Sequence, residues 1–189
     1  MPDYAYMYAL PYELYEKYGV RRYGFHGTSH RYITKRALEM LDMPAEGSKI
    51  ITCHIGNGAS VAAVKDGKSV DTSMGMTPLA GLMMGTRSGD VDPGIFPYVM
   101  DKTGLDMQGM IDMLNKKSGV AGITGISSDM REVDAAEKEG NERAHLAHEM
   151  LYYQIAKYIG QYYVAMGGCD AIVFTAGLGE NQPQLRKRV

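Results

Sequence analysis

Four short segments of the sequence combine glycines with side chains that can bind an anion. Each segment is polar, lies in apolar surroundings and offers glycine N–H groups, and three of them add a histidine or an arginine. Backbone donors, imidazole groups and a guanidinium group together are what a phosphoryl-transfer site requires. The segments are residues 24–30, 54–60, 85–90 and 177–181.

The segment 54–60 predicts a tight turn between two strands. It follows the apolar run 49–53 and precedes a second apolar run at 61–64. Its centre, residues 56–58, is Gly-Asn-Gly, and these residue types tolerate a positive φ. Such a turn exposes N–H groups that can converge on a phosphate, although an ordinary hairpin turn would have the same composition.

The same segments, in the same order, resemble motifs of the acetate kinase family. The resemblance covers essentially the whole chain and implies an α/β domain of the ribonuclease-H-like, actin-like ATPase class, with a mixed sheet flanked by helices. The matching motifs are RYGFHGTSH at 22–30, HIGNG at 54–58, MGMTPL at 74–79, GTRSG at 85–89 and GLGEN at 177–181.

The resemblance also implies that the domain is truncated. Residues 1–189 correspond to the nucleotide-binding second domain of an acetate kinase, incomplete, with the first domain and the C-terminal end absent. The family's catalytic aspartate would lie just before Met1 and its substrate-side arginine further upstream. The carboxylate associated with Mg²⁺ would follow Val189, so no metal ligand is assigned within this chain.

The implied reaction is transfer of the γ-phosphoryl group of ATP to acetate by direct in-line displacement, giving acetyl phosphate and ADP, with Mg²⁺ as cofactor. His26 and Arg87 match the family's transition-state stabilisers, and their N–H groups suit the charge that spreads over three phosphoryl oxygens. Considered in isolation, His26 would be a hydrogen-bonded structural residue, and Arg87 would pair with Asp90 or Asp92. His30 is predicted to support the loop that carries His26.

Three segments are assigned to ATP by the resemblance. One of their residues, Asp129, also fits a helix N-cap ahead of Glu132, and the two roles can coexist. The assigned residues are His54, Ile55, Gly56, Asn57 and Gly58 at the phosphates, Asp129, Met130 and Arg131 at the adenosine end, and Gly177, Leu178, Gly179, Glu180 and Asn181 at the nucleotide again.

Two other functions remain open at this point. A relative acting on propionate or butyrate would share this half of the protein, and a non-catalytic nucleotide-binding or dimerisation module would need no acid substrate. The resemblance further implies a homodimer. Ala80 departs from the motif, because many members of the family have a glutamate there.

The composition predicts a cytoplasmic domain without nucleic-acid or membrane partners. The chain has 189 residues, of which 45% are hydrophobic and 22% charged, so it is long enough to form one hydrophobic core. Its net charge of −2 indicates no basic surface for nucleic acid or an acidic membrane. No apolar run approaches the roughly 20 residues of a membrane span, and residues 1–10 do not resemble a signal peptide. Cys53 and Cys169 lie beside apolar runs and are predicted to be buried free thiols.

Hydrophobic periodicity places these segments on mixed strands and helices. Helices are expected from a cap at Thr28 or Ser29 to about Asp42, over 107–117, and over 142–166 with Gly167 ending the helix. Strands are expected at 49–53, 59–65, 68–72 and 171–175, the last buried on both faces, with a two-residue turn at 66–67 and a further helix after the turn 177–181.

Three smaller patterns complete the prediction. Residues 62–69 satisfy a permissive P-loop pattern, but the expected strand–turn–strand context excludes that geometry. The tyrosines at 4, 6, 8, 12, 15 and 18 predict an extended segment that runs into a short helix and packs on one neighbour. His145 and His148 share a helix face and are predicted to be surface residues.

Overall fold

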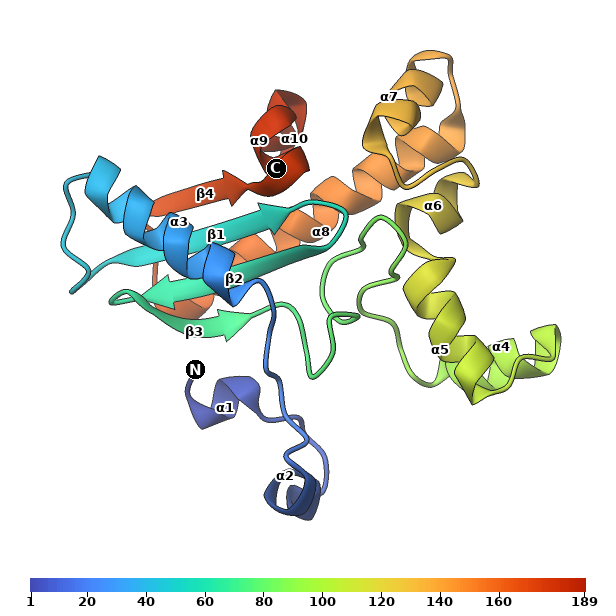
Figure 1. The fold of residues 1–189 in the computed structure, drawn as a ribbon, viewed down its shortest axis with the longest axis horizontal. Helices are drawn as coiled ribbons and strands as arrows, with labels where there is room; N and C mark the ends of the chain where they lie inside the picture. The colour runs from blue at the N-terminus through green and yellow to red at the C-terminus, as the bar shows by residue number, and fades with distance from the viewer.

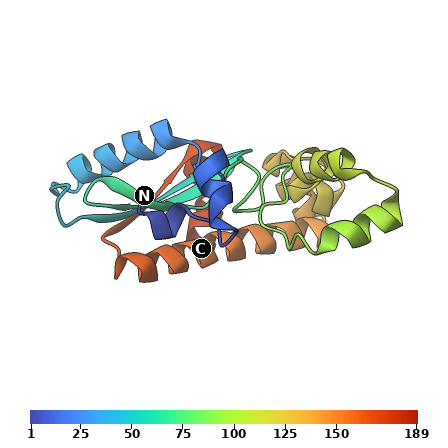
Figure 2. The ribbon, with the colours of Figure 1, turned by 90° about the horizontal axis from the view of Figure 1, so that it is seen from below.

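The computed structural model describes residues 1–189, and its centre is a four-stranded sheet between two helices (Figure 1). Helix α3 covers one face of the sheet and the long helix α8 covers the other, and the view from below shows the three layers (Figure 2). The strands are β1 (Lys49–Ile55), β2 (Ala59–Lys65), β3 (Lys68–Thr72) and β4 (Ala171–Thr175). The helices are α1 (Asp3–Tyr6), α2 (Tyr12–Tyr18), α3 (Gly27–Met40), α4 (Ile95–Thr103), α5 (Met107–Lys116), α6 (Gly119–Thr124), α7 (Met130–Lys138), α8 (Glu142–Met166), α9 (Ala176–Asn181) and α10 (Pro183–Arg188).

The sheet is mixed, as predicted, with the order β3-β2-β1-β4. Antiparallel pairs join β1 to β2 and β2 to β3, and β4 runs parallel to β1. Asp66 and Gly67 have φ values of 54° and 70°, which confirms the predicted two-residue turn and with it the absence of a P-loop at 62–69. Strand β1 is longer than predicted, because His54 and Ile55 still pair with β2.

Side chains alternate along β1 and β2 between an apolar face of the sheet and a face that also carries polar groups. Ile51, Cys53 and Val61 are fully buried in the main core, which lies between the sheet and α8. The residues between them face α3, and among these Thr52, His54 and Ser60 are polar. The face under α3 therefore receives the histidines of residues 26–30.

Helix α8 begins and ends as its sequence predicts. The Asn141 side chain accepts a hydrogen bond from the Ala144 N–H, and Gly167 ends the helix in the left-handed conformation with φ 68°. Leu151 and Ile155 are buried on its inner face, whose apolar contacts with the sheet stabilise the domain.

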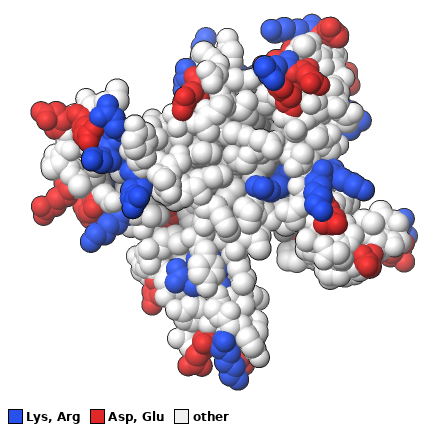
Figure 3. All heavy atoms as spheres, viewed as in Figure 1, with Lys and Arg blue, Asp and Glu red and all other residues white.

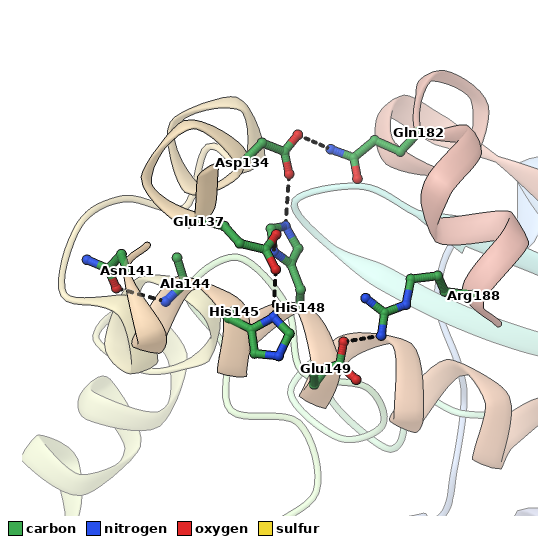
Figure 4. A network of polar contacts seen from close by, with 9 residues as sticks. All are labelled: Asp134, Glu137, Asn141, Ala144, His145, His148, Glu149, Gln182 and Arg188. Atoms are coloured by element: carbon green, nitrogen blue, oxygen red, sulfur yellow. Dashed lines mark hydrogen bonds and ion pairs between the residues drawn. The ribbon is translucent and has the colours of Figure 1, made fainter. Parts of the chain in front are cut away.

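His148 is buried, so the prediction that it lies at the surface is wrong. Its Nε2 is 2.9 Å from Asp134 Oδ1 and its Nδ1 is 2.7 Å from Glu137 Oε2, as Figure 4 shows. The exposed His145 contacts the same glutamate at 2.7 Å, and Gln182 donates to Asp134 at 2.9 Å. These contacts fix α7 to α8 and α10, and α7 begins at the segment assigned to adenosine.

Of the N-terminal tyrosines, Tyr4 and Tyr6 lie on α1 and Tyr8 lies in the loop that follows, so the predicted extended segment is wrong. The predicted short helix is confirmed as α2, which carries Tyr12, Tyr15 and Tyr18. Residues 3–6 form one turn of helix, and the chain pairs as a strand only at the isolated bridge between Met7 and Arg21. Tyr15 packs on Tyr6 and Tyr12 with ring centroids 5.8 and 5.9 Å away. The contact between Tyr6 and Tyr15 holds α1 and α2 together.

Strand β4 is an edge strand in this chain and is not buried on both faces, since Ile172 is 45% exposed. The segment after it is helical from Ala176, where a turn was predicted, and the expected further helix follows as α10. Both cysteines are free thiols, as predicted, and Cys53 is buried, whereas Cys169 is only half-buried and differs from the prediction in this respect.

Charged side chains of both signs alternate around the edge of the face shown in Figure 3, and the middle of that face carries few charges. None of the helices combines the length and hydropathy needed to cross a lipid bilayer.

Candidate active site

The turn between β1 and β2 packs directly against the loop that contains Arg87. The Gly85 N–H donates to the Asn57 carbonyl at 3.0 Å. A β-carbon on Gly85 would lie 1.9 Å from Asn57 Oδ1, so any larger residue there would displace the Asn57 side chain. A hydrogen bond closes the turn itself, because the Gly56 N–H donates to the Gly58 carbonyl at 3.1 Å.

Three histidines gather beside this turn, two from residues 26–30 and one from β1. The rings of His26 and His54 are stacked, with centroids 4.0 Å apart and planes 16° from parallel. His26 Nδ1 is 2.9 Å from Ser60 Oγ, and His54 Nδ1 is 2.9 Å from Ser29 Oγ. The imidazole of His26 is therefore held on one edge and one face.

His26 is the N-cap residue of α3 and has a left-handed backbone with φ 59°. The prediction that Thr28 or Ser29 caps this helix is wrong, because both lie in its first turn. Histidine is among the residues that adopt this conformation more often than most. With this backbone conformation the His26 ring lies beside the turn 56–58, with Nε2 3.5 Å from the position of a β-carbon on Gly58.

The loop before His26 is fixed to the end of β3 by Arg22. Its guanidinium Nη1 donates to the carbonyls of Thr72 and Ser73, each at 3.0 Å. Gly24 has φ 74°, and a β-carbon there would lie 2.5 Å from the Thr72 methyl group. The first motif of the resemblance thus contains residues that position His26 as well as His26 itself.

The pKa values of all three histidines are lowered from the ordinary value of imidazole. Burial, followed by the nearby His54 and Arg87, lowers the pKa of His26 to about 4. Burial and the other two imidazoles lower the pKa of His30 to about 4, and burial lowers the pKa of His54. The rings of His26 and His30 are therefore neutral at pH 7, and each has one donor nitrogen and one acceptor nitrogen.

Arg87 has no carboxylate partner. Its Nη1 makes two long contacts, 3.4 Å to the Pro78 carbonyl and 3.6 Å to Met84 Sδ. The pairing with Asp90 or Asp92 is wrong, because Asp90 accepts from the Gly81 N–H and from Tyr158, and Asp92 accepts from the Gly94 N–H. A guanidinium without an acidic partner has free donors for an anionic ligand.

His26 and Arg87 face the same space above Gly58. A β-carbon on Gly58 would lie 3.3 Å from Arg87 Nη1 and 3.5 Å from His26 Nε2. One neutral donor and one positive donor thus converge where the absence of a side chain leaves room for a small group.

A cavity of about 370 Å³ adjoins the turn 56–58 on the α8 side. It brings together members of all three segments predicted to bind ATP. Its lining residues are Gly56, Asn57, Met83, Met84, Gly85, Val120, Ser128, Asp129, Met130, Leu151, Gly177 and Leu178. Glycines and polar groups line one part and apolar side chains the other, a combination typical of ligand pockets.

Several predicted residues also engage in local contacts, and Glu180, Asn181 and Gly179 do so without lining this cavity. The Asp129 carboxylate caps α7 by accepting from the Arg131 N–H at 2.9 Å and also binds the Arg131 guanidinium, which lowers the pKa of Asp129 to about 2. Glu180 accepts from Thr175 Oγ1 at 2.9 Å, and Asn181 donates to the Gly177 carbonyl at 2.9 Å. Gly179 is buried against the Phe174 backbone.

Several residues of the site were not singled out from the sequence. Ser60 and Thr52 contact the histidines, and Met83, Met84 and Leu151 form the apolar wall of the cavity. A signal for the first two exists, since they share a strand face with His54. The wall comes from a loop and a helix far apart in the sequence, and no local pattern joins them.

The whole chain matches a known protein family. The profile of the acetokinase family matches residues 1–189. The acetate kinase of Bacteroides thetaiotaomicron is 66% identical over 189 residues, which are 100% of this chain and 47% of that protein. The acetate kinase of Methanosarcina barkeri is 60% identical over 189 residues, with 100% and 46% covered. The chain therefore spans about half the length of the curated relatives it matches.

Solved structures agree with this similarity. The crystal structure of Porphyromonas gingivalis acetate kinase superposes with a TM-score of 0.97 at 58% identity, covering 100% of this chain and 47% of that one. A propionate kinase from Francisella tularensis gives a TM-score of 0.94 at 47% identity, covering 100% and 48%. The predicted α/β architecture, a mixed sheet flanked by helices, is confirmed.

Proposed function

Because this chain belongs to the acetokinase family, we propose that it is the nucleotide-binding second domain of a kinase that transfers the γ-phosphoryl group of ATP to acetate. The products are acetyl phosphate and ADP, and the transfer is direct and in line. The observation that carries the proposal is the convergence of His26 Nε2 and Arg87 Nη1 above Gly58.

Transfer of a phosphoryl group spreads negative charge over its three equatorial oxygens, and catalysis consists mainly of positioning and charge stabilisation. The neutral His26 donates one hydrogen bond to these oxygens, and Arg87 adds a charge-assisted one. Because neither group has a competing carboxylate, the donors of both are free for the phosphoryl oxygens.

The nucleotide lies along the cavity beside the turn. The N–H groups of residues 56–58 bind its phosphates, and residues 177–181 contact the nucleotide again. Residues 129–131 bind the adenosine end, where the apolar wall of Met84 and Leu151 suits an uncharged ring.

Mg²⁺ is the cofactor in this proposal, with its ligands outside residues 1–189. The His, Cys, Asp and Glu side chains of the chain form no group of three that could hold a metal ion.

Two further candidates have specific support. A kinase for propionate or butyrate is favoured by the Francisella tularensis neighbour, whose name is propionate kinase and whose fold matches almost as well. A non-catalytic nucleotide-binding or dimerisation module would use the same cavity beside residues 56–57, 129–130 and 177–178 without an acid substrate. The proposal also includes a homodimer and a cytoplasmic location.

The test is an assay of the full-length protein with ATP, Mg²⁺ and each of acetate, propionate and butyrate. Acyl phosphate formation with the highest kcat/KM for acetate is the expected result. A higher kcat/KM for a longer acid would assign the second candidate, and no acyl phosphate from any acid would contradict kinase function.

The 189-residue chain alone separates binding from catalysis. We expect no acetyl phosphate above a mock-purified control, because the catalytic and Mg²⁺-associated carboxylates that the resemblance implies are not among residues 1–189. We also expect weak binding of ATP. Titration with ATP should shift the amide signals of Gly56, Gly58 and Gly177 and leave that of Gly140 unchanged. The absence of any shift in folded protein at millimolar ATP would contradict the nucleotide site.

A further inference from the structure

A chain of three buried side chains leads from His26 into the sheet. Ser60 Oγ is 2.9 Å from His26 Nδ1 and 2.7 Å from His30 Nε2. His30 Nδ1 is in turn 2.7 Å from Thr52 Oγ1. Thr52 and Ser60 are 0% exposed and His30 is 6% exposed. Water therefore does not compete for these contacts, and each hydroxyl must form its hydrogen bonds with other groups of the protein.

The direction of the hydrogen bonds follows from the inner end. The Thr52 hydroxyl can donate to His30 Nδ1 at 2.7 Å or to the Ala62 carbonyl at 3.4 Å. Hydroxyl donors lie about 2.5–3.0 Å from their acceptors, so the hydrogen of Thr52 belongs to His30. Nδ1 of His30 is consequently an acceptor.

The remaining hydrogens are then determined one by one. A neutral imidazole has a single N–H, so His30 carries its hydrogen on Nε2 and donates it to Ser60 Oγ. The Ser60 hydroxyl has one hydrogen, which is left for His26 Nδ1. The hydrogen of His26 must therefore be on Nε2, the atom that faces Gly58 and Arg87.

We propose that Thr52, His30 and Ser60 form a one-way hydrogen-bonded chain that fixes His26 as its Nε2–H tautomer. In that form His26 offers a donor to the transferring phosphoryl group, whereas the reversed chain would turn a lone pair toward its oxygens. The three are positioning residues, and their catalytic consequence rests on the function proposed above. The low pKa values of His26 and His30 support the neutral state that the chain requires.

Nitrogen-15 NMR of the histidine-labelled 189-residue chain tests the tautomers without any assay of activity. The His26 signals are identified by their loss in His26→Gln. We expect pyrrole-type Nε2 and pyridine-type Nδ1 shifts for both His26 and His30. A pyrrole-type Nδ1 in either residue, or averaged shifts that report two tautomers of His26, would overturn the proposal.

Variants test whether the chain sets the tautomer. Ser60→Ala and Thr52→Val should move the His26 nitrogen shifts toward the average of two tautomers, while Thr52→Ser, which keeps the hydroxyl, should retain the wild-type shifts. If folded Ser60→Ala and Thr52→Val both keep the wild-type His26 shifts, the hydrogen-bonded chain does not set the His26 tautomer. Because the wild-type measurement stands by itself, a variant that fails to fold does not remove the test.

Kinetics of the full-length kinase separate this proposal from the proposed function. Ser60→Ala should lower kcat about tenfold and leave KM for ATP within about twofold, since a wrong tautomer affects the transition state and not ground-state binding. If NMR shows the fixed tautomers but His26→Ala has the wild-type kcat, the proposed function is contradicted and the hydrogen-bonded chain is not. If NMR shows mixed tautomers but His26→Ala is inactive, the hydrogen-bonded chain is contradicted and the proposed function is not.

Discussion

His26 and Arg87 approach each other across Gly58, where a β-carbon would lie 3.5 Å from His26 Nε2 and 3.3 Å from Arg87 Nη1. The two side chains come from segments 61 positions apart, one ahead of α3 and one in the loop before α4, and the turn between β1 and β2 lies between them. Their roles in phosphoryl transfer can be separated from roles in folding or ATP binding.

Removing either side chain should slow the reaction without weakening substrate binding. In the full-length kinase, we expect His26→Ala and Arg87→Ala to lower kcat by about 10²–10³, or roughly 3–4 kcal/mol, with much smaller changes in KM for ATP. His145→Ala and Arg36→Ala, at exposed positions away from the site, are the matched controls. An Arg87→Ala enzyme with the wild-type kcat would contradict the assignment.

Filling the space above Gly58 should have a similar effect. The methyl group of Gly58→Ala would occupy the place assigned to the phosphoryl group, and we expect kcat/KM to fall at least about tenfold, since small misplacements of reacting groups are costly. The free energy of unfolding should change little, because φ at Gly58 is not positive. Gly160→Ala, in open space on α8, is the control and should stabilise the protein by about 0.5–1 kcal/mol. Equal kcat/KM for the Gly58 variant and the wild type would contradict a phosphoryl site here.

The buried histidines should make folding sensitive to acid. His30 has a folded-state pKa of about 4 against an ordinary value of 6.5. Between these values the unfolded chain binds more protons than the folded one, so stability is full above about pH 6.5 and falls as the pH is lowered toward 4. For this one buried group the loss amounts to about 3 kcal/mol. Urea unfolding of wild type and His30→Gln at pH 7.5 and pH 4.5 measures it: the wild type should lose more stability than the variant on acidification, and equal losses would contradict the shift.

The contacts of His148 should stabilise the packing of α7 on α8. His148→Ala removes a buried ring that contacts two carboxylates, and we expect it to lower the free energy of unfolding by about 2–4 kcal/mol. His145→Ala removes an exposed partner of the same glutamate and should cost no more than about 1 kcal/mol. Chemical denaturation of both variants decides the matter, and equal small effects would mean that the buried contacts do not stabilise the helix pair.

The elements with strong periodic patterns could be predicted from the sequence. The β2–β3 turn at Asp66 and Gly67, helix α8 and its end at Gly167 follow from local residue preferences, which the structure does not override. Strand β4 was misjudged because an apolar run such as 171–175 indicates burial without indicating whether a neighbouring strand covers it. Helix α6, with two glycines among six residues, has no helical pattern, and its place depends on packing against α8.

The candidate site could be predicted only in part. Residues in motifs, such as His26 and Arg87, were found because their types and neighbours are specific. Ser60 and Thr52 became visible only when the register of β1 and β2 placed them under α3. His148 shares its helix face with Leu151 and Ile155, a spacing that indicates burial, but its carboxylate partners come from α7 and no local pattern predicts that contact.

The most direct test of in-line transfer is the stereochemistry at phosphorus in the full-length kinase. ATP made chiral at its γ-phosphorus with oxygen isotopes is converted to acetyl phosphate, and the configuration of the product is determined. Direct transfer of the phosphoryl group from ATP to acetate, with His26 and Arg87 as hydrogen-bond donors, predicts net inversion. Retention, which requires two inversions and a covalent phosphoenzyme such as phosphohistidine at His26, would contradict the account.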